Sequence, residues 1–185
     1  AKMTSAIGWF ARNPEQVAVL NGMSKSYAMT GWRVGFLAAH PMLFKKISAM
    51  QGHSTSSICS IAQKAALAAL TGPTDCIDHM REAFMRRRDL AMKAIETWPW
   101  AVCLKPDGAF YLFVDVRKCY GGAVNNSTEM CTWLLDKVHV ALVPGAAFGD
   151  DNCIRFSYAV ADDVLARALE ATGAEMARLA QGATR

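Results

Sequence analysis

The sequence lacks both the composition of a disordered chain and the long apolar run of a membrane helix. Charged residues make up 19% of its 185 residues and apolar residues 52%, a balance typical of globular domains. The alanine-rich stretch at residues 58–70 is interrupted by Lys64 and falls short of the ~20 apolar residues that span a bilayer. We therefore expect a folded chain that does not cross a membrane.

The sequence also lacks the cysteine and histidine spacings of disulfide scaffolds and metal sites. Its six cysteines are far apart and none forms a C-x-x-C motif, and its four histidines show no ligand spacing. The cysteines are Cys59, Cys76, Cys103, Cys119, Cys131 and Cys153, and the histidines are His40, His53, His79 and His139. These spacings predict reduced cysteines, a cytoplasmic location and no metal site.

Basic residues are in slight excess but are not concentrated. The formal net charge is +4. One basic cluster, Arg86–Arg88, lies in a helical pattern beside Glu82 and Asp89, which is more typical of a solvated helix face than of a nucleic-acid patch. No nucleic-acid partner is expected.

Hydrophobic patterns predict alternating strands and helices in the first part of the chain. Short apolar runs predict buried strands at 17–20 and 34–39, with a loop at 23–30 between them. Apolar residues at helical spacing predict helices over 41–50 and 58–70. The hydroxyls of Ser54–Ser57 are expected to cap the second helix, and a left-handed turn at Gly72 before Pro73 is expected to end it.

A long helical pattern separates this part from a second one. It begins at Thr74 and stops at Trp98-Pro99, which is long enough to connect two domains. The patterns beyond it predict paired strands at 101–104 and 110–116, helices at 127–138 and 162–179, and strands at 140–143 and 154–158. The sequence thus predicts an α/β chain with an αβα part at 1–72, a connecting helix at 73–97 and a small α+β domain at 98–185.

One lysine lies where covalent chemistry is possible. Lys25 follows the first predicted strand, among small hydroxylated neighbours, and Arg33 lies eight residues later. Desolvation and a nearby cation both favour the neutral amine, which attacks a carbonyl carbon to form a Schiff base. A single lysine is more often a solvated surface amine, so the surrounding residues must decide between the two interpretations.

The residues around Lys25 resemble the signature of a known enzyme family. The stretch 24–35 reads S-K-S-Y-A-M-T-G-W-R-V-G, and it closely resembles the S-K-x-x-x-M-T-G-W-R-x-G signature of pyridoxal-phosphate-dependent class I (fold-type I) aminotransferases, of the aspartate aminotransferase type. The resemblance implies that Lys25 forms the Schiff base with pyridoxal 5'-phosphate and then moves a proton. It also implies that Arg33 binds the cofactor phosphate, which a planar guanidinium can do in a bidentate manner.

Three later stretches resemble other motifs of the same family, in the same order. Residues 106–111 resemble P-x-G-A-F-Y, and residues 143–149 resemble V-x-P-G-x-x-F-G. Residues 154–159 resemble I-R-x-S-Y-A, whose arginine pairs with the α-carboxylate of the substrate. The resemblance therefore implies that Arg155 binds the substrate.

The resemblance covers only the carboxyl-terminal half of the family's usual length. It implies part of the large three-layer αβα domain that binds pyridoxal phosphate, followed by a small α+β domain. Residues 1–10 lack an initiator methionine and a signal-peptide pattern, and we expect the chain to be a piece of a longer protein. The piece alone is expected to be inactive, because the family's Gly-rich phosphate loop and the Asp that binds the pyridine nitrogen have no counterpart in it.

The resemblance implies transamination between an L-amino acid and a 2-oxo acid, with aspartate and 2-oxoglutarate as the leading pair. Residues 51–58 resemble the S-H-S-T-S-N-P loop of aspartate-type members, but Ser57 and Ile58 replace its Asn and Pro, and no arginine is present for a side-chain carboxylate. An aromatic-amino-acid or kynurenine aminotransferase, a C-S lyase and an inert fragment remain alternatives. A cytoplasmic homodimer is expected.

Overall fold

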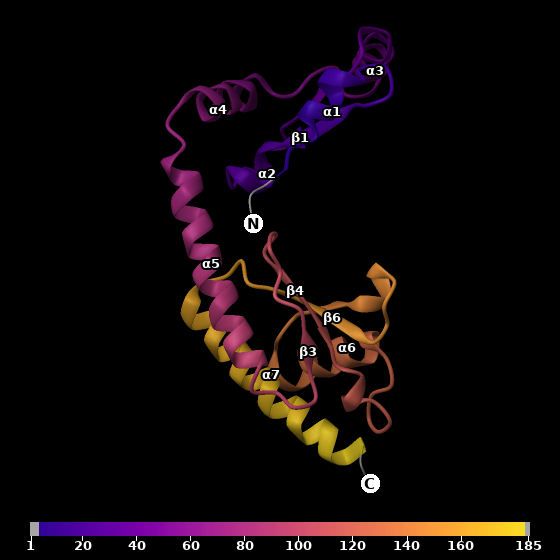
Figure 1. Ribbon diagram of the computed structural model, residues 1–185, viewed down its shortest axis with the longest axis vertical. Coiled ribbons are helices and arrows are strands. Elements are labelled where there is room, and N and C mark those ends of the chain that lie inside the picture. Colours follow the sequence, from indigo (N-terminus) through magenta and orange to yellow (C-terminus); the bar gives the residue numbers. More distant parts are fainter. Residues whose placement is uncertain (1–3, 184–185) are drawn as a thin grey trace. The chain divides into compact units, whose positions relative to one another are not determined.

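The computed structural model describes residues 4–183 (Figure 1). Within this range the chain forms two compact units, which divide between Met80 and Arg81.

The first unit contains one small sheet. Strand β1 (Val19–Gly22) pairs antiparallel with β2 (Gly35–Ala38), with Leu20 opposite Leu37, and helix α1 (Ile7–Arg12) precedes them. The two predicted strands are confirmed, the first shifted along the chain by two residues. The expectation that they are buried is wrong for the described residues, since Leu20 is 78% exposed and Phe36 45%. Neither side chain belongs to the buried core of this unit.

The helices after the ribbon are confirmed, but their ends differ from the prediction. Helix α3 (Pro41–Ser54) includes Ser54, and Ser56 has a positive φ of 61°. Helix α4 (Ser60–Thr71) begins after Cys59 without a side-chain cap, so the expected capping by Ser54–Ser57 is wrong. The left-handed turn is also wrong, because Gly72 is extended with φ −85°, and Pro73, which lacks an amide hydrogen, follows it.

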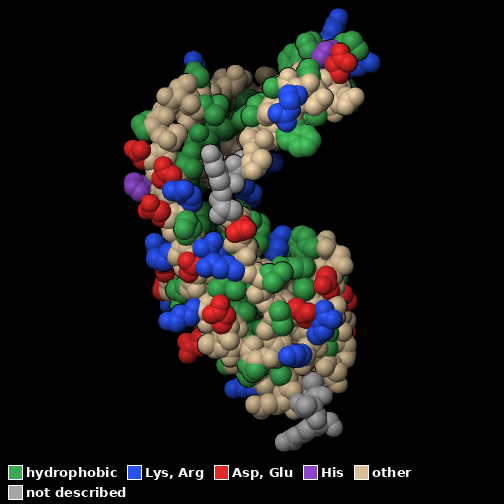
Figure 2. All heavy atoms as spheres, viewed as in Figure 1, with side chains coloured by type: hydrophobic (Ala, Val, Ile, Leu, Met, Phe, Trp, Pro, Cys, Tyr) green, Lys and Arg blue, Asp and Glu red, His purple; other side chains and the backbone are tan. Residues whose placement is uncertain are grey.

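The buried core of the first unit is small. It consists of Met23, Met29 and Val34 packed with Ala62 and Ala66 of α4. Helix α3 buries none of its residues, and its Met42 is 71% exposed. Apolar side chains are accordingly visible over the surface of this unit (Figure 2).

Helix α5 (Asp75–Ile95) confirms the predicted long helix and includes the division between the units. Its last turns bury Ala91, Met92 and Ile95 in the core of the second unit. The expectation of a solvated Arg86–Arg88 cluster holds only for Arg86, whose side chain is 59% exposed. Arg87 and Arg88 are 23% and 16% exposed, and they pair with Asp162 and Asp89.

The second unit is built on a four-stranded antiparallel sheet with the strand order β3-β4-β6-β5. Its strands are β3 (Val102–Cys103), β4 (Tyr111–Asp115), β5 (Val143–Pro144) and β6 (Cys153–Ser157). The pairing of β3 with β4 confirms the predicted strand pair. Strand β5 begins at Val143, so the strand expected at 140–143 is misplaced.

Two helices complete this unit, α6 (Ser127–Val138) and α7 (Asp162–Ala183). Helix α6 matches the predicted bounds, and the Asn126 side chain caps it by accepting a hydrogen bond from the Glu129 amide. The core combines fully buried residues of the sheet, such as Leu112 and Ile154, with Leu134 of α6 and Met176 of α7. This core holds β4 and β6, which carry residues of the candidate site.

No helix within residues 4–183 is both long and apolar enough to cross a membrane. Over the same range, no cluster of three or more His, Cys, Asp or Glu residues is arranged to hold a metal ion. All six cysteines are unpaired. Burial raises the pKa of Cys119 to about 12 and that of Cys131 to about 11.

Candidate active site

The segment between β1 and β2 folds into a compact loop. The Met23 amide donates to the Val34 carbonyl at the neck of the loop, over 3.1 Å, and the Met29 amide donates to the Met23 carbonyl. The Thr30 hydroxyl donates to the Ser24 carbonyl over 2.9 Å. Because Met23, Met29 and Val34 are also buried, the loop is fixed by both hydrogen bonds and packing.

Lys25 lies on the short helix α2 (Met23–Ser26) at the start of this loop. The expected loop at 23–30 therefore begins with one helical turn. The Lys25 carbonyl accepts a hydrogen bond from the amide of Ala28, which has a positive φ of 53°. The Lys25 side chain is exposed, so the described residues do not provide the desolvation that the sequence suggested.

Arg33 ends the same loop, directly after the 3₁₀ turn η1 (Thr30–Trp32). Its backbone is left-handed, with φ 55°, and its Nη1 donates to the Thr30 carbonyl over 3.1 Å. This bond uses one of the five N–H donors of the guanidinium. The exposed side chain therefore retains N–H donors that can form hydrogen bonds with an anion such as a phosphate.

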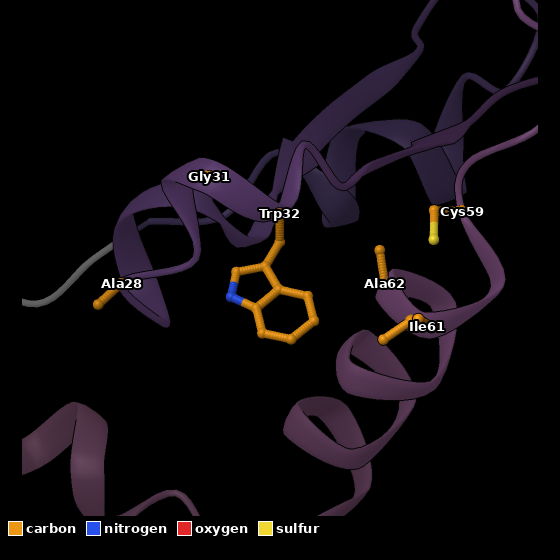
Figure 3. Close-up of a pocket in the computed structure, with 6 residues that line it drawn as sticks. All are labelled: Ala28, Gly31, Trp32, Cys59, Ile61 and Ala62. Carbon is orange, nitrogen blue, oxygen red and sulfur yellow. The ribbon is translucent and has the colours of Figure 1, made fainter.

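A hollow of about 500 Å³ lies beside the loop (Figure 3). The Trp32 ring projects into it, and Cys59, Ile61 and Ala62 border it at the beginning of α4. Neither Lys25 nor Arg33 is among its lining residues. The hollow is therefore a mainly apolar space beside the loop, and neither cation lines it.

Arg155 lies on β6 in the second unit, opposite Phe113 of β4 and Val143 of β5. Its guanidinium carbon is 4.2 Å from the ring centroid of Tyr111 and 4.4 Å from that of Phe148. No carboxylate within residues 4–183 forms an ion pair with it under 4 Å. Two aromatic rings therefore contact this half-buried cation.

The loop that carries Phe148 is held in place by several polar contacts. It begins with the 3₁₀ turn η3 (Gly145–Phe148), and Gly149 follows with φ 89°. The buried Ser127 hydroxyl donates to Asp151 over 2.5 Å and accepts from the Ala146 amide over 3.2 Å. Hydrogen bonds from the Asn152 backbone and side-chain amides lower the pKa of Asp150 in the same loop.

The three residues predicted for the site fall into two groups. Lys25 and Arg33 belong to one hydrogen-bonded loop of the first unit, and Arg155 belongs to the sheet of the second unit. Tyr111 and Phe148 lie in motifs that the sequence analysis identified, but their contacts with Arg155 were not predicted. Only the pairing register of β4 and β6 and the path of the loop after β5 place them there.

Comparisons with known proteins identify the family. The model of the family "Aminotransferase class I and II" matches residues 1–171. The chain is 42% identical over 165 residues to a Petunia hybrida protein named "Bifunctional aspartate aminotransferase and glutamate/aspartate-prephenate aminotransferase", covering 84% of this chain and 34% of that protein.

Solved structures of similar proteins agree with this match. The crystal structure of an aspartate aminotransferase from Rhizobium meliloti has a TM-score of 0.84 at 37% identity, covering 89% of this chain and 43% of that one. An aromatic aminotransferase from Pyrococcus horikoshii has a TM-score of 0.82 at 32% identity, covering 89% of this chain and 44% of that one.

These similarities confirm the predicted resemblance and the α/β fold class. The chain spans between 34% and 40% of the length of the curated relatives it matches. Within that span the family match includes Lys25, Arg33 and Arg155. The chain belongs to the family of class I and II aminotransferases.

Proposed function

We propose that this chain supplies the lysine and two arginines of a pyridoxal-phosphate-dependent aminotransferase. The observation that carries the proposal is the loop at 23–34, which presents an amine and a guanidinium from one hydrogen-bonded element in a chain of the aminotransferase family. The amine of Lys25 suits the cofactor aldehyde, and the guanidinium of Arg33 suits its phosphate. The donor chemistry of the loop therefore fits this cofactor.

Each residue has a separate task in this proposal. When bound, pyridoxal phosphate supplies an electron sink that stabilises negative charge at the α-carbon of the substrate. Lys25 would take the proton from that carbon with its Nζ and deliver it to C4′, the former aldehyde carbon of the cofactor. Arg33 fixes the phosphate, and Arg155 binds the α-carboxylate and so orients the bond to be broken.

Aspartate and 2-oxoglutarate are the proposed amino donor and acceptor. The names of the Petunia hybrida and Rhizobium meliloti relatives support aspartate. The similarity to the Pyrococcus horikoshii aromatic aminotransferase favours an aromatic amino acid as the second candidate. A kynurenine aminotransferase and a C-S lyase are compatible with the same three residues.

We also propose the organisation of the longer protein. Residues 1–72 would form the carboxyl-terminal part of the large cofactor-binding domain, 73–97 the connecting helix and 98–185 the small domain. The enzyme would be a cytoplasmic homodimer. The six unpaired cysteines support a reducing compartment.

Substitution of Lys25 and Arg155 in the full-length protein tests the proposed activity, with any sequence that precedes residue 1 included. Lys25→Ala is expected to abolish turnover, and Lys64→Ala, at an exposed lysine of α4, is expected to leave it unchanged. Arg155→Ala is expected to reduce kcat/KM by a factor that corresponds to about 2 to 5 kcal/mol of lost transition-state stabilisation, because the substrate carboxylate loses its partner. Unchanged turnover in Lys25→Ala would contradict the assignment.

The inert-fragment alternative has its own outcome. Turnover by the full-length protein together with none by the 185 residues alone would mean that the residues are assigned correctly and that the piece is incomplete. Turnover by neither protein, with aspartate, phenylalanine and kynurenine as donors, would contradict the proposed reaction.

A further inference from the structure

We propose that Tyr111 and Phe148 are positioning residues, which hold the guanidinium of Arg155 in the orientation that binds the substrate carboxylate. The inference rests on the proposed function, since it takes Arg155 as the carboxylate anchor. It adds two residues to the site, together with the loop that carries one of them.

The strand register brings Tyr111 to Arg155. Arg155 of β6 lies opposite Phe113 of β4, and Tyr111 lies opposite Ser157. Tyr111 and Phe113 are two residues apart, so both side chains leave the sheet on the same face as Arg155. A diagonal neighbour in an antiparallel pair is within reach of long side chains, and the ring centroid of Tyr111 is 4.2 Å from the guanidinium carbon.

Phe148 reaches the same guanidinium from the other neighbour of β6. It follows β5, which pairs with β6 on the side away from β4, and its centroid is 4.4 Å from the guanidinium carbon. The Phe113 ring packs against Phe148 at a centroid distance of 6.1 Å and an interplanar angle of 88°. Phe148 is thus supported by a neighbouring ring while it contacts Arg155.

The two rings contact the Arg155 guanidinium, and within residues 4–183 no carboxylate forms an ion pair with it. A carboxylate partner would compete with the substrate for the N–H donors, whereas an aromatic ring attracts the cation without using those donors. The rings can therefore hold the side chain while its donors remain available to a planar carboxylate.

The loop after β5 is built to keep Phe148 at this place. The Ser127 hydroxyl fixes the loop at two points, through Asp151 and through the Ala146 amide. A Cβ on Gly145 would be 2.1 Å from the Cys153 carbonyl oxygen, so the loop lies directly against β6. These contacts fix the backbone that carries Phe148, and the rings of Phe148 and Tyr111 restrict the orientation of the Arg155 guanidinium.

A side chain that is already ordered before the ligand binds loses little further conformational freedom on binding. Immobilising a flexible side chain weakens an association by roughly threefold to tenfold, so losing one ring should weaken carboxylate binding by about that factor. The effect should appear in Kd and KM much more than in kcat, because the arginine contacts the carboxylate in both the ground state and the transition state.

The test uses the full-length protein loaded with pyridoxal phosphate and titrated calorimetrically with succinate, a dicarboxylate that has no amino group to react. Phe148→Leu and Tyr111→Leu are expected to raise the Kd for succinate roughly threefold to tenfold. Phe148→Tyr and Tyr111→Phe, which keep the ring, are expected to stay within about twofold of the wild type. Borohydride reduction, which attaches the bound cofactor irreversibly to Lys25, should give the same amount of adduct in all four variants as in the wild type.

Phe84→Leu is the matched control. Phe84 is a partly buried aromatic residue of the same unit that stacks on Phe110 at 5.7 Å and is not among the rings that contact Arg155. It is expected to lower Tm without changing the Kd for succinate. An unchanged Kd in Phe148→Leu and Tyr111→Leu, or an equal rise in Phe84→Leu, would overturn the positioning role.

Arg155→Ala separates failure of this inference from failure of the proposed function. A loss of succinate binding in Arg155→Ala with unchanged binding in the two leucine variants would overturn the positioning role alone. Unchanged binding in Arg155→Ala, or no binding of succinate by the wild type, would overturn the carboxylate anchor and the positioning role with it.

Discussion

Gly145→Ala is expected to be one of the most damaging substitutions in the second unit. The added Cβ would lie 2.1 Å from the Cys153 carbonyl oxygen and 2.3 Å from that of Asp150, and both are backbone atoms that cannot rotate away. The turn would have to move by about 1 Å or more to restore ordinary contacts. This movement would disturb the hydrogen bonds from the Asp150 amide to Gly145 and from the Ala146 amide to Ser127.

The size of the effect follows from these contacts. Overpacking costs about 1 to 3 kcal/mol, and the half-buried Asp150 amide, if left without its partner, adds about 1 to 3 kcal/mol. We therefore expect Gly145→Ala to lower the free energy of unfolding by about 2 to 6 kcal/mol. Succinate binding should also weaken, because the same turn carries Phe148 to Arg155.

Urea unfolding of the full-length protein, followed by circular dichroism, measures this loss. Gly108→Ala is the matched control, since nothing lies within 4 Å of a Cβ built at Gly108. The control should stay within about 0.5 kcal/mol of the wild type. Equal stability of the two variants would refute the argument from the close approach of the turn to β6.

Three further predictions concern the second unit. Hydrogen bonds from Arg86 and Arg87 lower the pKa of Asp162 from its usual value, so Asp162→Asn should be less stable than the wild type at neutral pH. The ionised Asp162 carboxylate stabilises the folded state, and this stabilisation disappears as the carboxyl is protonated. The difference in Tm between the wild type and Asp162→Asn should therefore shrink as the pH falls below ~4. Glu175 is 8% exposed and accepts the indole N–H of Trp133 over 2.9 Å, so Glu175→Ala should cost about 1 to 3 kcal/mol in urea unfolding and Glu175→Gln less. Burial raises the pKa of Cys119 to about 12, so a thiol reagent at pH ~8 should label it only after unfolding, and rapid labelling of the native protein would contradict its burial.

Local signals explain the parts of the fold that the sequence predicted well. Helix α6 has its predicted bounds because Asn126 and Glu129 cap its start and its apolar residues face one core. The long helix α5 has a strong apolar period and ends before Pro99. Neither element depends on a distant partner for its position along the chain.

Interactions beyond the local sequence explain the parts that differ. The serines at 54–57 are good capping residues, but α3 extends through Ser54 and Ser56 turns the chain with a positive φ, so α4 begins only at Ser60. Leu20 is an apolar strand residue, yet a two-stranded ribbon within residues 4–183 leaves it exposed. Local propensity does not include either effect.

In the candidate site, too, local motifs were predictable from the sequence and contacts between separate elements were not. The motif around Lys25 is contiguous, so the sequence identifies Lys25 and Arg33 together, and the structure adds that one hydrogen-bonded loop contains both. The contacts of Arg155 with Tyr111 and Phe148 join residues more than forty positions and seven positions apart, respectively. Such contacts depend on strand register, which a motif does not specify.

Borohydride reduction of the full-length protein with added pyridoxal phosphate, followed by peptide mapping by mass spectrometry, tests most directly whether Lys25 holds the cofactor. We expect a reduced pyridoxyl group on Nζ of Lys25 in the wild type and none in Lys25→Ala. A modified lysine at another position in place of Lys25, or no adduct at all, would contradict the assignment of Lys25 as the residue that holds the cofactor.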